Sequence, residues 1–374
     1  MWTPPDNDPV AQAYYSIRSP SSQQSIFSQL LPWIRSTDPT HGRAALPRLP
    51  EEAALRLNHR HRDGRVLLNG NEREWVAYQV WEPKQGVEDR NTDLCFIHGI
   101  NDFGGKFAVH AAKFLDEGYR IIVPDLPSHG RSTGIHVHCP SMEALVDAVY
   151  EVVKDVALKD SELLQSTGGA LTQARKTFVA GQSLGGFTAA YVCLKYGAPI
   201  DTDLPVNESF RPTISGGMIL CPMLAISPET RPPFLIELVA RLISSFASAL
   251  PLAAANKGKN SEDPEVEQQF EMDPQTYHGK LRVGTGLGIL QGLIDINKKM
   301  NHLKVPFLIC HGTGDRVTSY HGSEKLFREA SSTDKEIKLF PDYQHILLRK
   351  GKNEKDDERR QSVLNEMLGW MQRH

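Results

Sequence analysis

The sequence predicts an α/β protein in which a mainly parallel central sheet is flanked by helices and interrupted by one helical insertion. From residue 74 onward, short apolar runs of strand character alternate with segments whose apolar residues recur at helical spacing. About eighty residues after position 222 break this alternation and show helical spacing only. With 374 residues, 40% of them hydrophobic, the chain can bury a large core, in one domain with insertions or in two domains.

The expected strands are short apolar runs followed by turn-forming residues. They cover residues 75–81, 93–98, 120–124, 177–180, 214–221, 305–311 and 336–340. Between the third and fourth runs, residues 142–153 place their apolar side chains on one helical face behind Ser141, a residue type that caps helix N-termini. Because ligands on parallel sheets bind at the carboxyl ends of strands, residues directly after these runs are the first candidates for a functional site.

We expect four segments along the chain. Residues 1–70 are rich in Pro, Ser, Gln and Arg, and we interpret them as a partly irregular N-terminal extension lying loosely on the surface, with a membrane-touching or partner-binding element as the alternative. Residues 71–222 and 304–374 form the two parts of the core, and residues 223–303 form a helical cap or lid. The apolar face that runs from Phe234 to Leu250 would give this cap an apolar underside.

Composition and charge argue against several classes of protein. The net charge of −3 provides no basic field of the kind that nucleic-acid-binding proteins use. The apolar runs are too short for a membrane span, and the first residues lack the basic start and apolar run of a signal peptide. Five cysteines without CxxC spacing are expected to be buried apolar residues in a reducing compartment, as for Cys95, Cys221 and Cys310. We therefore expect a cytoplasmic protein with no metal and no organic cofactor.

One segment indicates nucleophilic catalysis. The run Lys176-Thr-Phe-Val-Ala reads as a strand, the pattern Gly181-x-Ser183-x-Gly185 as a sharp turn, and the residues after it as a helix. Glycines on both sides of Ser183 allow the strained backbone that such a turn requires. The Ser183 hydroxyl would then be exposed above the sheet, close to the N-terminus of a helix.

A serine hydroxyl needs a base to take its proton, and that base needs an acid to fix its tautomer. His345 follows the strand at 336–340, and Asp315 lies in the loop after the strand at 305–311. The order Ser183, Asp315, His345 is the one expected of an α/β-hydrolase. Asp125 and Asp342 are the alternative acids, although Asp125 is better explained by turn hydrogen bonding and Asp342 would have to fold back to reach His345.

The negative charge that develops on a substrate carbonyl oxygen needs two backbone donors. Leu184, directly after the serine, is the first candidate. The second is Ile100, because the His98-Gly99 turn after the strand at 93–98 would aim its N–H at the space above Ser183. Asn101 in the same loop is a candidate wall residue of the site.

These motifs resemble the monoacylglycerol lipase group of the α/β-hydrolase superfamily, the serine-aminopeptidase-like branch, from about residue 70 to the C-terminus. The resemblance is carried by Gly181-Gln-Ser-Leu-Gly-Gly186, Asp125-Leu-Pro-Ser-His-Gly-Arg-Ser132, Cys221-Pro-Met-Leu-Ala-Ile-Ser-Pro228, Val305-Pro-Phe-Leu-Ile-Cys-His-Gly-Thr-Gly-Asp-Arg-Val317 and the Tyr-Gln-His345 ending. Two features depart from the family pattern: the strip His98-Gly-Ile-Asn-Asp-Phe103, and the N-terminal extension, which has no family counterpart.

The resemblance implies an esterase or lipase that acts through an acyl-enzyme on a small-molecule ester or lipid, with peripheral contact to membranes or lipid droplets through the cap. It gives Ser183, Asp315 and His345 the triad roles and Ile100 and Leu184 the oxyanion roles. The substrate contacts that we expect from it are Asn101, Leu224, Leu238 and Leu242. An acyltransferase or transesterase, a lactonase, and a non-catalytic protein with a relic site remain as alternatives, because the fold does not choose the substrate.

Overall fold

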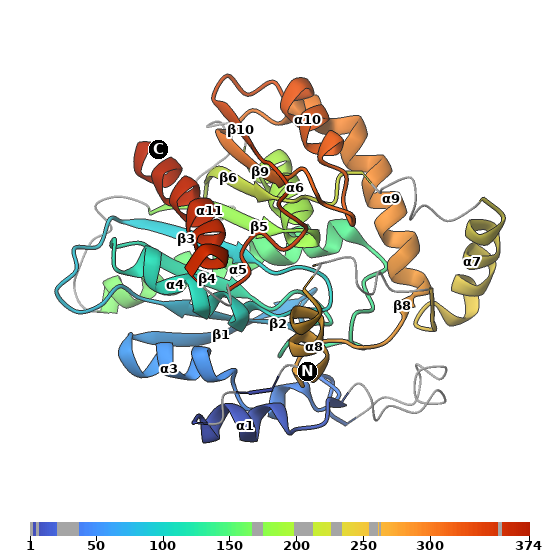
Figure 1. The fold of residues 1–374 in the computed structure, drawn as a ribbon, viewed down its shortest axis with the longest axis horizontal. Coiled ribbons are helices and arrows are strands. Elements are labelled where there is room, and N and C mark those ends of the chain that lie inside the picture. Colours follow the sequence, from blue (N-terminus) through green and yellow to red (C-terminus); the bar gives the residue numbers. More distant parts are fainter. Residues whose placement is uncertain are drawn as a thin grey trace.

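The protein is built around one eight-stranded sheet (Figure 1). The computed structural model describes residues 3–4, 7–20, 37–166, 175–197, 212–225, 234–253, 261, 263–350 and 354–374, with only the backbone of residues 234–239, 253 and 354–356. The strands of the sheet are β1 (His61–Leu68), β2 (Asn71–Trp81), β3 (Thr92–Ile97), β4 (Arg120–Pro124), β5 (Lys176–Gln182), β6 (Ile214–Leu220), β9 (Phe307–Gly312) and β10 (Lys335–Phe340).

The sheet is mainly parallel, as predicted. Its spatial order is β1-β2-β4-β3-β5-β6-β9-β10, and every pairing from β4 to β10 is parallel. The hairpin β1-β2 is antiparallel and joins the sheet by pairing with β4. The carboxyl ends of the parallel strands therefore meet at one edge, where the loops after β3, β5, β6 and β9 lie together.

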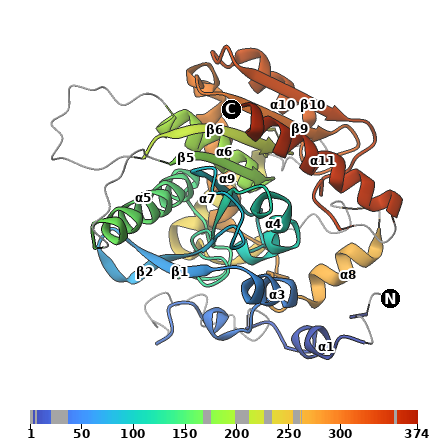
Figure 2. The ribbon, with the colours of Figure 1, turned by 90° about the vertical axis from the view of Figure 1, so that its left-hand side faces the viewer.

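Helices cover both faces of this sheet (Figures 1 and 2). Side chains of β3 show why, since Cys95 and Ile97 enter one core cluster while Leu94 and Phe96 enter the other. The first cluster contains residues of α5 (Met142–Ser166), α6 (Leu184–Tyr196), α9 (Val283–Lys299) and α10 (Tyr320–Glu329). The second contains residues of α3 (Pro50–Asn58), α4 (Ala108–Leu115) and α11 (Glu354–Arg373). Continuous apolar strands thus reflect burial on both sides.

The predicted core boundary at residue 70 is wrong, because the sheet begins at His61. Strand β1 was missed because it reads His-Arg-Asp-Gly-Arg-Val-Leu-Leu, with polar residues at most of its positions. Such a strand can form at the edge of a sheet, where β1 pairs only with β2 and exposes much of its length. Antiparallel pairing along eight residues, including the two leucines, supplies the order that the residue pattern does not indicate.

The cap contains more than helices. Its described elements are α7 (Phe234–Ala247), β7 (Pro251–Ala253), α8 (Pro264–Met272), β8 (Leu281–Arg282) and the first turns of α9. The short strands β7 and β8 form an antiparallel pair that the sequence did not predict, since three-residue and two-residue strands show no periodicity. Helix α7 packs against α9 on the outer side of the molecule (Figure 1). None of the described helices is both long and apolar enough to cross a membrane.

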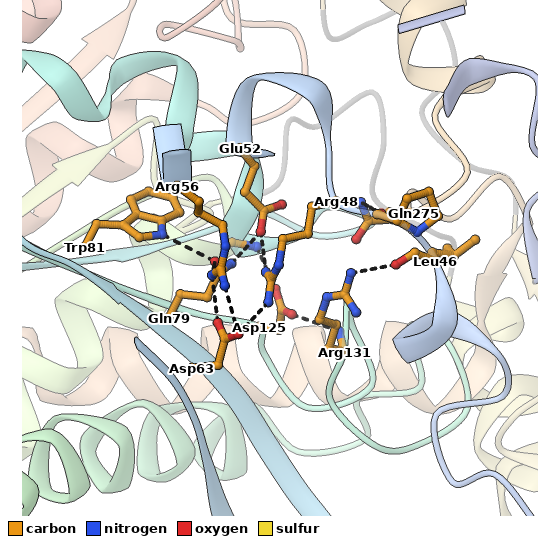
Figure 3. Close-up of polar contacts among 12 residues, drawn as sticks. Leu46, Arg48, Glu52, Arg56, Asp63, Gln79, Trp81, Asp125, Arg131 and Gln275 are labelled. Carbon is orange, nitrogen blue, oxygen red and sulfur yellow. Dashed lines mark hydrogen bonds and ion pairs between the residues drawn. The ribbon is translucent and has the colours of Figure 1, made fainter. Parts of the chain in front are cut away.

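The described part of the N-terminal extension is firmly attached, which corrects the expectation of a loose arm. Arg43, near the start of the 3-10 helix η2 (Arg43–Ala45), is buried and donates to the carbonyls of Gly130, Ser132 and Gly134. In the opposite direction, Arg131 donates to the carbonyls of Ala44 and Leu46 (Figure 3). The two arginines satisfy carbonyls of the opposite segment, so either loss would leave buried polar groups unpaired.

A second polar network holds α3 against the β1-β2 hairpin (Figure 3). Arg48 contacts both Glu52 and Asp63, and Arg56 donates to Asp63 and, at 2.6 Å, to Gln79. Glu52 is only 2% exposed and also accepts from Gln79 Nε2 at 2.8 Å. These contacts link residues that are far apart in the sequence, and they explain why the extension is ordered here although its composition is that of a loop.

Candidate active site

Ser183 lies at a strained turn between β5 and α6. Its backbone has φ of 60° and ψ of −117°, a conformation that is costly for a residue with a side chain. The neighbouring glycines allow it: a Cβ atom at Gly181 would overlap the carbonyl of Gly185, and one at Gly185 would overlap the carbonyl of Ile97. The turn is anchored by the Ser183 amide, which donates to the Leu220 carbonyl at 3.0 Å.

Two later loops bring an acid and a base together. Asp315 follows β9 and His345 follows β10, and Asp315 Oδ2 accepts a hydrogen bond from His345 Nδ1 at 2.7 Å. Both side chains are nearly buried, so water does not compete for this contact. His345 is fixed with its Nε2 atom pointing away from the acid, the orientation that a proton acceptor for a hydroxyl requires.

Asp315 is surrounded by donors. Its Oδ1 accepts from the amides of Val317 and Thr318 at 2.7 and 2.9 Å, and its Oδ2 accepts from Thr318 Oγ1 at 2.8 Å. His311 Nε2 also lies 3.2 Å from Oδ2. Burial by itself raises the pKa of Asp315, but the hydrogen bonds from His311 and His345, the charge of His345 and the Thr318 amide together hold this pKa well below its usual value. The carboxylate therefore stays ionised.

Ser183 and His345 line the same cavity, whose volume is about 930 Å³. Among the described residues no hydrogen bond joins the Ser183 hydroxyl to His345. Catalytic contacts of this kind are often long in free enzymes and shorten when substrate binds. His311, the other histidine in contact with Asp315, is fully buried, does not line the cavity and is held by Ser323 at 2.7 Å. Of the two histidines in contact with Asp315, His345 is therefore the one that lines the cavity.

The loop after β3 lies beside the serine. A Cβ atom on Gly99 would be 3.6 Å from the Ser183 Cβ atom, so the Gly99-Ile100 segment is next to the nucleophile. Leu184 is the first residue of α6, and its N–H has no helical carbonyl in front of it. The amides of Ile100 and Leu184 thus come from two loops that meet at Ser183, the arrangement expected of an oxyanion hole.

Buried contacts that the sequence analysis did not identify hold this loop in place. His98 Nδ1 donates to the Gly99 carbonyl at 2.7 Å, and its Nε2 accepts from the Leu126 amide at 2.9 Å, which defines a neutral tautomer. Burial lowers the pKa of His98 to about 4. The cap contributes as well, because the Tyr277 amide donates to the carbonyl of Asn101, a residue with φ of 65°. The asparagine at position 101 is the one sequence signal that could have indicated this strained loop, since asparagine adopts a positive φ more readily than most residues.

The four expected substrate contacts have different outcomes. Asn101 lines the cavity. Leu224 does not, because it is 1% exposed and packs in the main core, and Leu242 does not, because its side chain is 64% exposed on the outer face of α7. The Leu238 side chain lies outside the described residues. From α7, the cavity is lined by Ala240 and Ile243, which the helical period places on a different face from Leu242.

The alternative acids have other roles. Asp125 accepts from the amides of Gly104 and Arg131, both at 2.8 Å, and so joins two loops as predicted for a turn residue. Asp342 is exposed at the loop after β10, with φ of 60°, and its amide donates to Thr313 Oγ1. Its carboxylate has no contact with His345 among the described residues.

Cys221, Asp315 and His345 have potential metal-binding atoms within 4.8 Å of one another. Their chemistry does not fit a metal ion, however. The two oxygens of Asp315 already accept five hydrogen bonds or close contacts, which leaves them little capacity to bind an ion. This cluster is better explained by its part in orienting His345.

A serine at a strained strand-to-helix turn, with an aspartate and a histidine after two later strands of one parallel sheet, is the arrangement of the α/β-hydrolase class. The comparison with protein families agrees. The model of the serine aminopeptidase family S33 matches residues 89–352, and the chain belongs to this family of hydrolases. The family match confirms the resemblance drawn from the sequence, and it leaves residues before 89 outside.

About a quarter of the aligned residues are identical between this chain and its curated relatives. Caffeoylshikimate esterase of Arabidopsis thaliana is 27% identical over 73% of this chain and 75% of its own length. Monoacylglycerol lipase of Mycolicibacterium smegmatis is 24% identical over 80% of this chain and 93% of its own length. Human monoglyceride lipase is 24% identical over 80% of this chain and 89% of its own length.

Solved structures support the fold. The structure of a soluble variant of monoglyceride lipase from Saccharomyces cerevisiae, in complex with a substrate analogue, has a TM-score of 0.58 at 20% identity and covers 83% of this chain and 94% of its own. Monoacylglycerol lipase of Paleococcus ferrophilus has a TM-score of 0.57 at 21% identity, covering 76% of this chain and 96% of its own. At these identities the likeness concerns the fold alone.

Proposed function

We propose that the protein is a serine hydrolase of carboxylic esters and that monoacylglycerols or similar single-chain esters are its substrates. The observation that carries the proposal is the Asp315–His345 hydrogen bond at the rim of a cavity that also contains Ser183. Relatives named monoacylglycerol lipase and caffeoylshikimate esterase support the reaction class, since both act on esters by their names.

In the proposed reaction, Ser183 Oγ attacks the ester carbonyl while His345 Nε2 takes its proton. Asp315 holds the imidazole in the required tautomer and stabilises the imidazolium that forms. The Ile100 and Leu184 amides donate to the oxygen that becomes negative, an interaction that contributes about 3 kcal/mol for each donor. His345 then gives the proton to the leaving alcohol, and the acyl group remains on Ser183. Water, activated by the same histidine, releases the acid.

The cavity suits a substrate with one hydrocarbon chain. The cavity has an apolar wall that comes from three parts of the cap: α7, the β7-β8 pair and α9. The residues that form it are Ile243, Leu252, Val283, Leu287 and Leu290. A cavity of about 930 Å³ is near the upper end for small-molecule sites, which leaves room for an acyl chain together with its alcohol.

A fluorophosphonate probe tests the nucleophile. We expect the wild-type protein to be labelled covalently and Ser183→Ala to be unlabelled, since only an activated serine attacks phosphorus at a useful rate. Hydrolysis of p-nitrophenyl esters, monoglycerides and lactones would then rank the substrates. An unlabelled wild-type protein, inert toward all three, would refute the proposed function.

We further propose that the cap touches a lipid surface, as a peripheral contact with membranes or lipid droplets. Leu242 and Phe246 stand one helical turn apart on α7 and are 64% and 89% exposed. Two large apolar side chains on one exposed face are unusual for a surface in contact with water alone.

Replacing Phe246 with glutamate should weaken binding to phosphatidylcholine vesicles by roughly tenfold or more, the loss expected when one large apolar side chain no longer enters the lipid. Leu242→Glu should act in the same direction, and cosedimentation with vesicles measures both. Ser245→Glu, which adds the same charge at an exposed position of the same helix, is the matched control. Equal loss in all three variants would mean that charge, and not apolar contact, is responsible.

A further inference from the structure

The N-terminal extension forms one wall of the cavity. Tyr15, Leu49 and Glu51 all line it, although they precede the residues that the family model matches. Tyr15, the last residue of α1 (Pro9–Tyr15), accepts a hydrogen bond of 3.4 Å from Gln269 Nε2 of α8. The extension, the loop after β3 and the cap therefore meet around one end of the cavity.

An apolar contact seats the extension on the loop after β3. Phe103 of that loop is 2% exposed and packs with Ala11, Tyr14, Tyr15 and Leu49 in a separate small core cluster. The extension thus covers the same loop that carries Ile100.

A polar contact seats the extension on the cap. Tyr14 Oη donates to Asp273 Oδ1 at 2.8 Å and accepts from Gln275 Nε2 at the same distance. Asp273 is 1% exposed, and its Oδ1 atom also accepts from the backbone amide of Gln275 at 2.9 Å. The extension is therefore held on both sides of the cavity end that it closes.

This end of the cavity is rich in carboxylates. Lys106 Nζ lies 3.1 Å from Asp102 Oδ1 and 3.6 Å from Asp273 Oδ2, and all three residues line the cavity. Glu51 lines it too, and the buried Oε2 atom of Glu51 has no hydrogen bond to any described residue. Three carboxyl groups thus line this cavity together with one ammonium group, which contacts Asp102 and Asp273. The acceptor atoms left over call for a ligand that donates hydrogen bonds.

We propose that the N-terminal extension, through Glu51 and Tyr15, completes a polar subsite that binds the hydroxyl groups of an uncharged alcohol portion of the substrate; the inference rests on the proposed esterase function. Hydroxyl groups donate to the free carboxylate oxygens. A carboxylate or phosphate on the alcohol would be repelled by Glu51 and Asp102.

The position of the subsite suits the alcohol and not the acyl chain. The segment after β3 passes Gly99 beside Ser183 and reaches Lys106 at the polar end, whereas the apolar walls come from α7, β7 and α9. An ester carbonyl held at the Ile100 amide has its two substituents pointing apart. The hydrocarbon is accommodated by the apolar wall, and the alcohol by the polar one.

Three butyrate esters with the same acyl group test the subsite: monobutyrin, ethyl butyrate and 1-butyryl-glycerol 3-phosphate. We expect Glu51→Gln to lower the ratio of kcat/KM for monobutyrin to kcat/KM for ethyl butyrate by about tenfold, the loss expected for one hydrogen bond to a charged group. Glu51→Lys should also raise kcat/KM for the phosphate-bearing ester relative to monobutyrin, since the repulsion becomes attraction.

Glu72→Gln is the matched control, because Glu72 is exposed on β2 and away from the cavity. Thermal unfolding of each variant checks that the extension remains folded. If both Glu51 variants keep the wild-type ratios among the three esters, the subsite proposal is overturned while the esterase proposal stands. If the wild-type protein hydrolyses none of the three, the proposed function itself fails.

Discussion

Asp315→Asn is expected to lower kcat for ester hydrolysis by about 10⁴-fold while leaving KM within a few-fold. The amide cannot satisfy the contacts that the carboxylate makes. Donors face both oxygens, the amides of Val317 and Thr318 on one and His345 Nδ1 on the other. Whichever way the asparagine turns, its NH₂ group meets a donor. Turned toward His345, it favours the tautomer whose Nε2 carries a proton and cannot accept one from Ser183.

Asp342→Asn is the control for this experiment. Asp342 lies three residues before His345 and was the alternative acid, but it is exposed and its backbone has φ of 60°, which asparagine tolerates well. We expect activity within twofold of wild type. Strong inactivation by Asp342→Asn together with an active Asp315→Asn protein would reverse the assignment. A thermal unfolding curve for each variant separates lost catalysis from lost folding.

Acidification should destabilise the protein already at pH values well above the pKa range of its carboxylates. Burial lowers the pKa of His98 to about 4 and holds the pKa values of His129 and His136 well below the usual 6.5. These histidines are neutral when folded and take up protons when unfolded, so the free energy of unfolding falls as the pH drops below 6.5 and, for His98, until about pH 4. Each costs about 1.4 kcal/mol per pH unit.

At pH 5 His98 alone, with its pKa of about 4, should remove about 2 kcal/mol of the stability present at pH 7.5, and His129 and His136 act in the same direction. Urea unfolding at the two pH values measures this difference. Asp315 acts in the same direction but at lower pH: because its pKa is lowered in the folded state, its stabilising contribution is complete at pH 5 and is lost only as the pH falls below its usual value of 3.8. The loss between pH 7.5 and 5 therefore reports on the histidines.

His136→Leu provides the sharpest test. Neither ring nitrogen of His136 has a hydrogen-bond partner among the described residues, so leucine, which is similar in volume, loses no such contact. We expect the variant to be more stable than wild type at pH 5 and to differ little from it at pH 7.5, because leucine takes up no proton on unfolding. His321→Leu, at an exposed position on α10, is the control. A wild-type protein whose stability is the same at both pH values would contradict the whole argument.

The parallel sheet could be predicted because its strands are buried on both faces. Strand β4, for example, contains a continuous apolar run, and the helices between strands have an apolar face at a fixed period. Strand β1 could not be recognised in this way, since Asp63 and Arg65 interrupt it and only its pairing with β2 makes it a strand. Residue patterns report burial, and edge strands have little of it.

The candidate nucleophile, acid and base could be predicted because their loops follow strands whose ends must meet. The cap contacts could not, as Leu242 and Leu224 demonstrate. Both are apolar and occur in the segments expected to touch substrate, but one faces solvent and the other packs in the core. The direction in which a helix turns its apolar side chains depends on what it packs against, and the wide apolar face of α7 does not by itself contain that information.

The sequence by itself determined the elements whose causes are local: the order of strands and helices, the strained serine turn with its glycines, and the chain order of Ser183, Asp315 and His345. Tertiary structure alone decided that Tyr14 meets Asp273 across 259 positions and that Glu51 faces the cavity. The physical reason is that periodicity and turn chemistry act over a few residues. Contacts between distant segments depend on how complete elements pack, which no short pattern records.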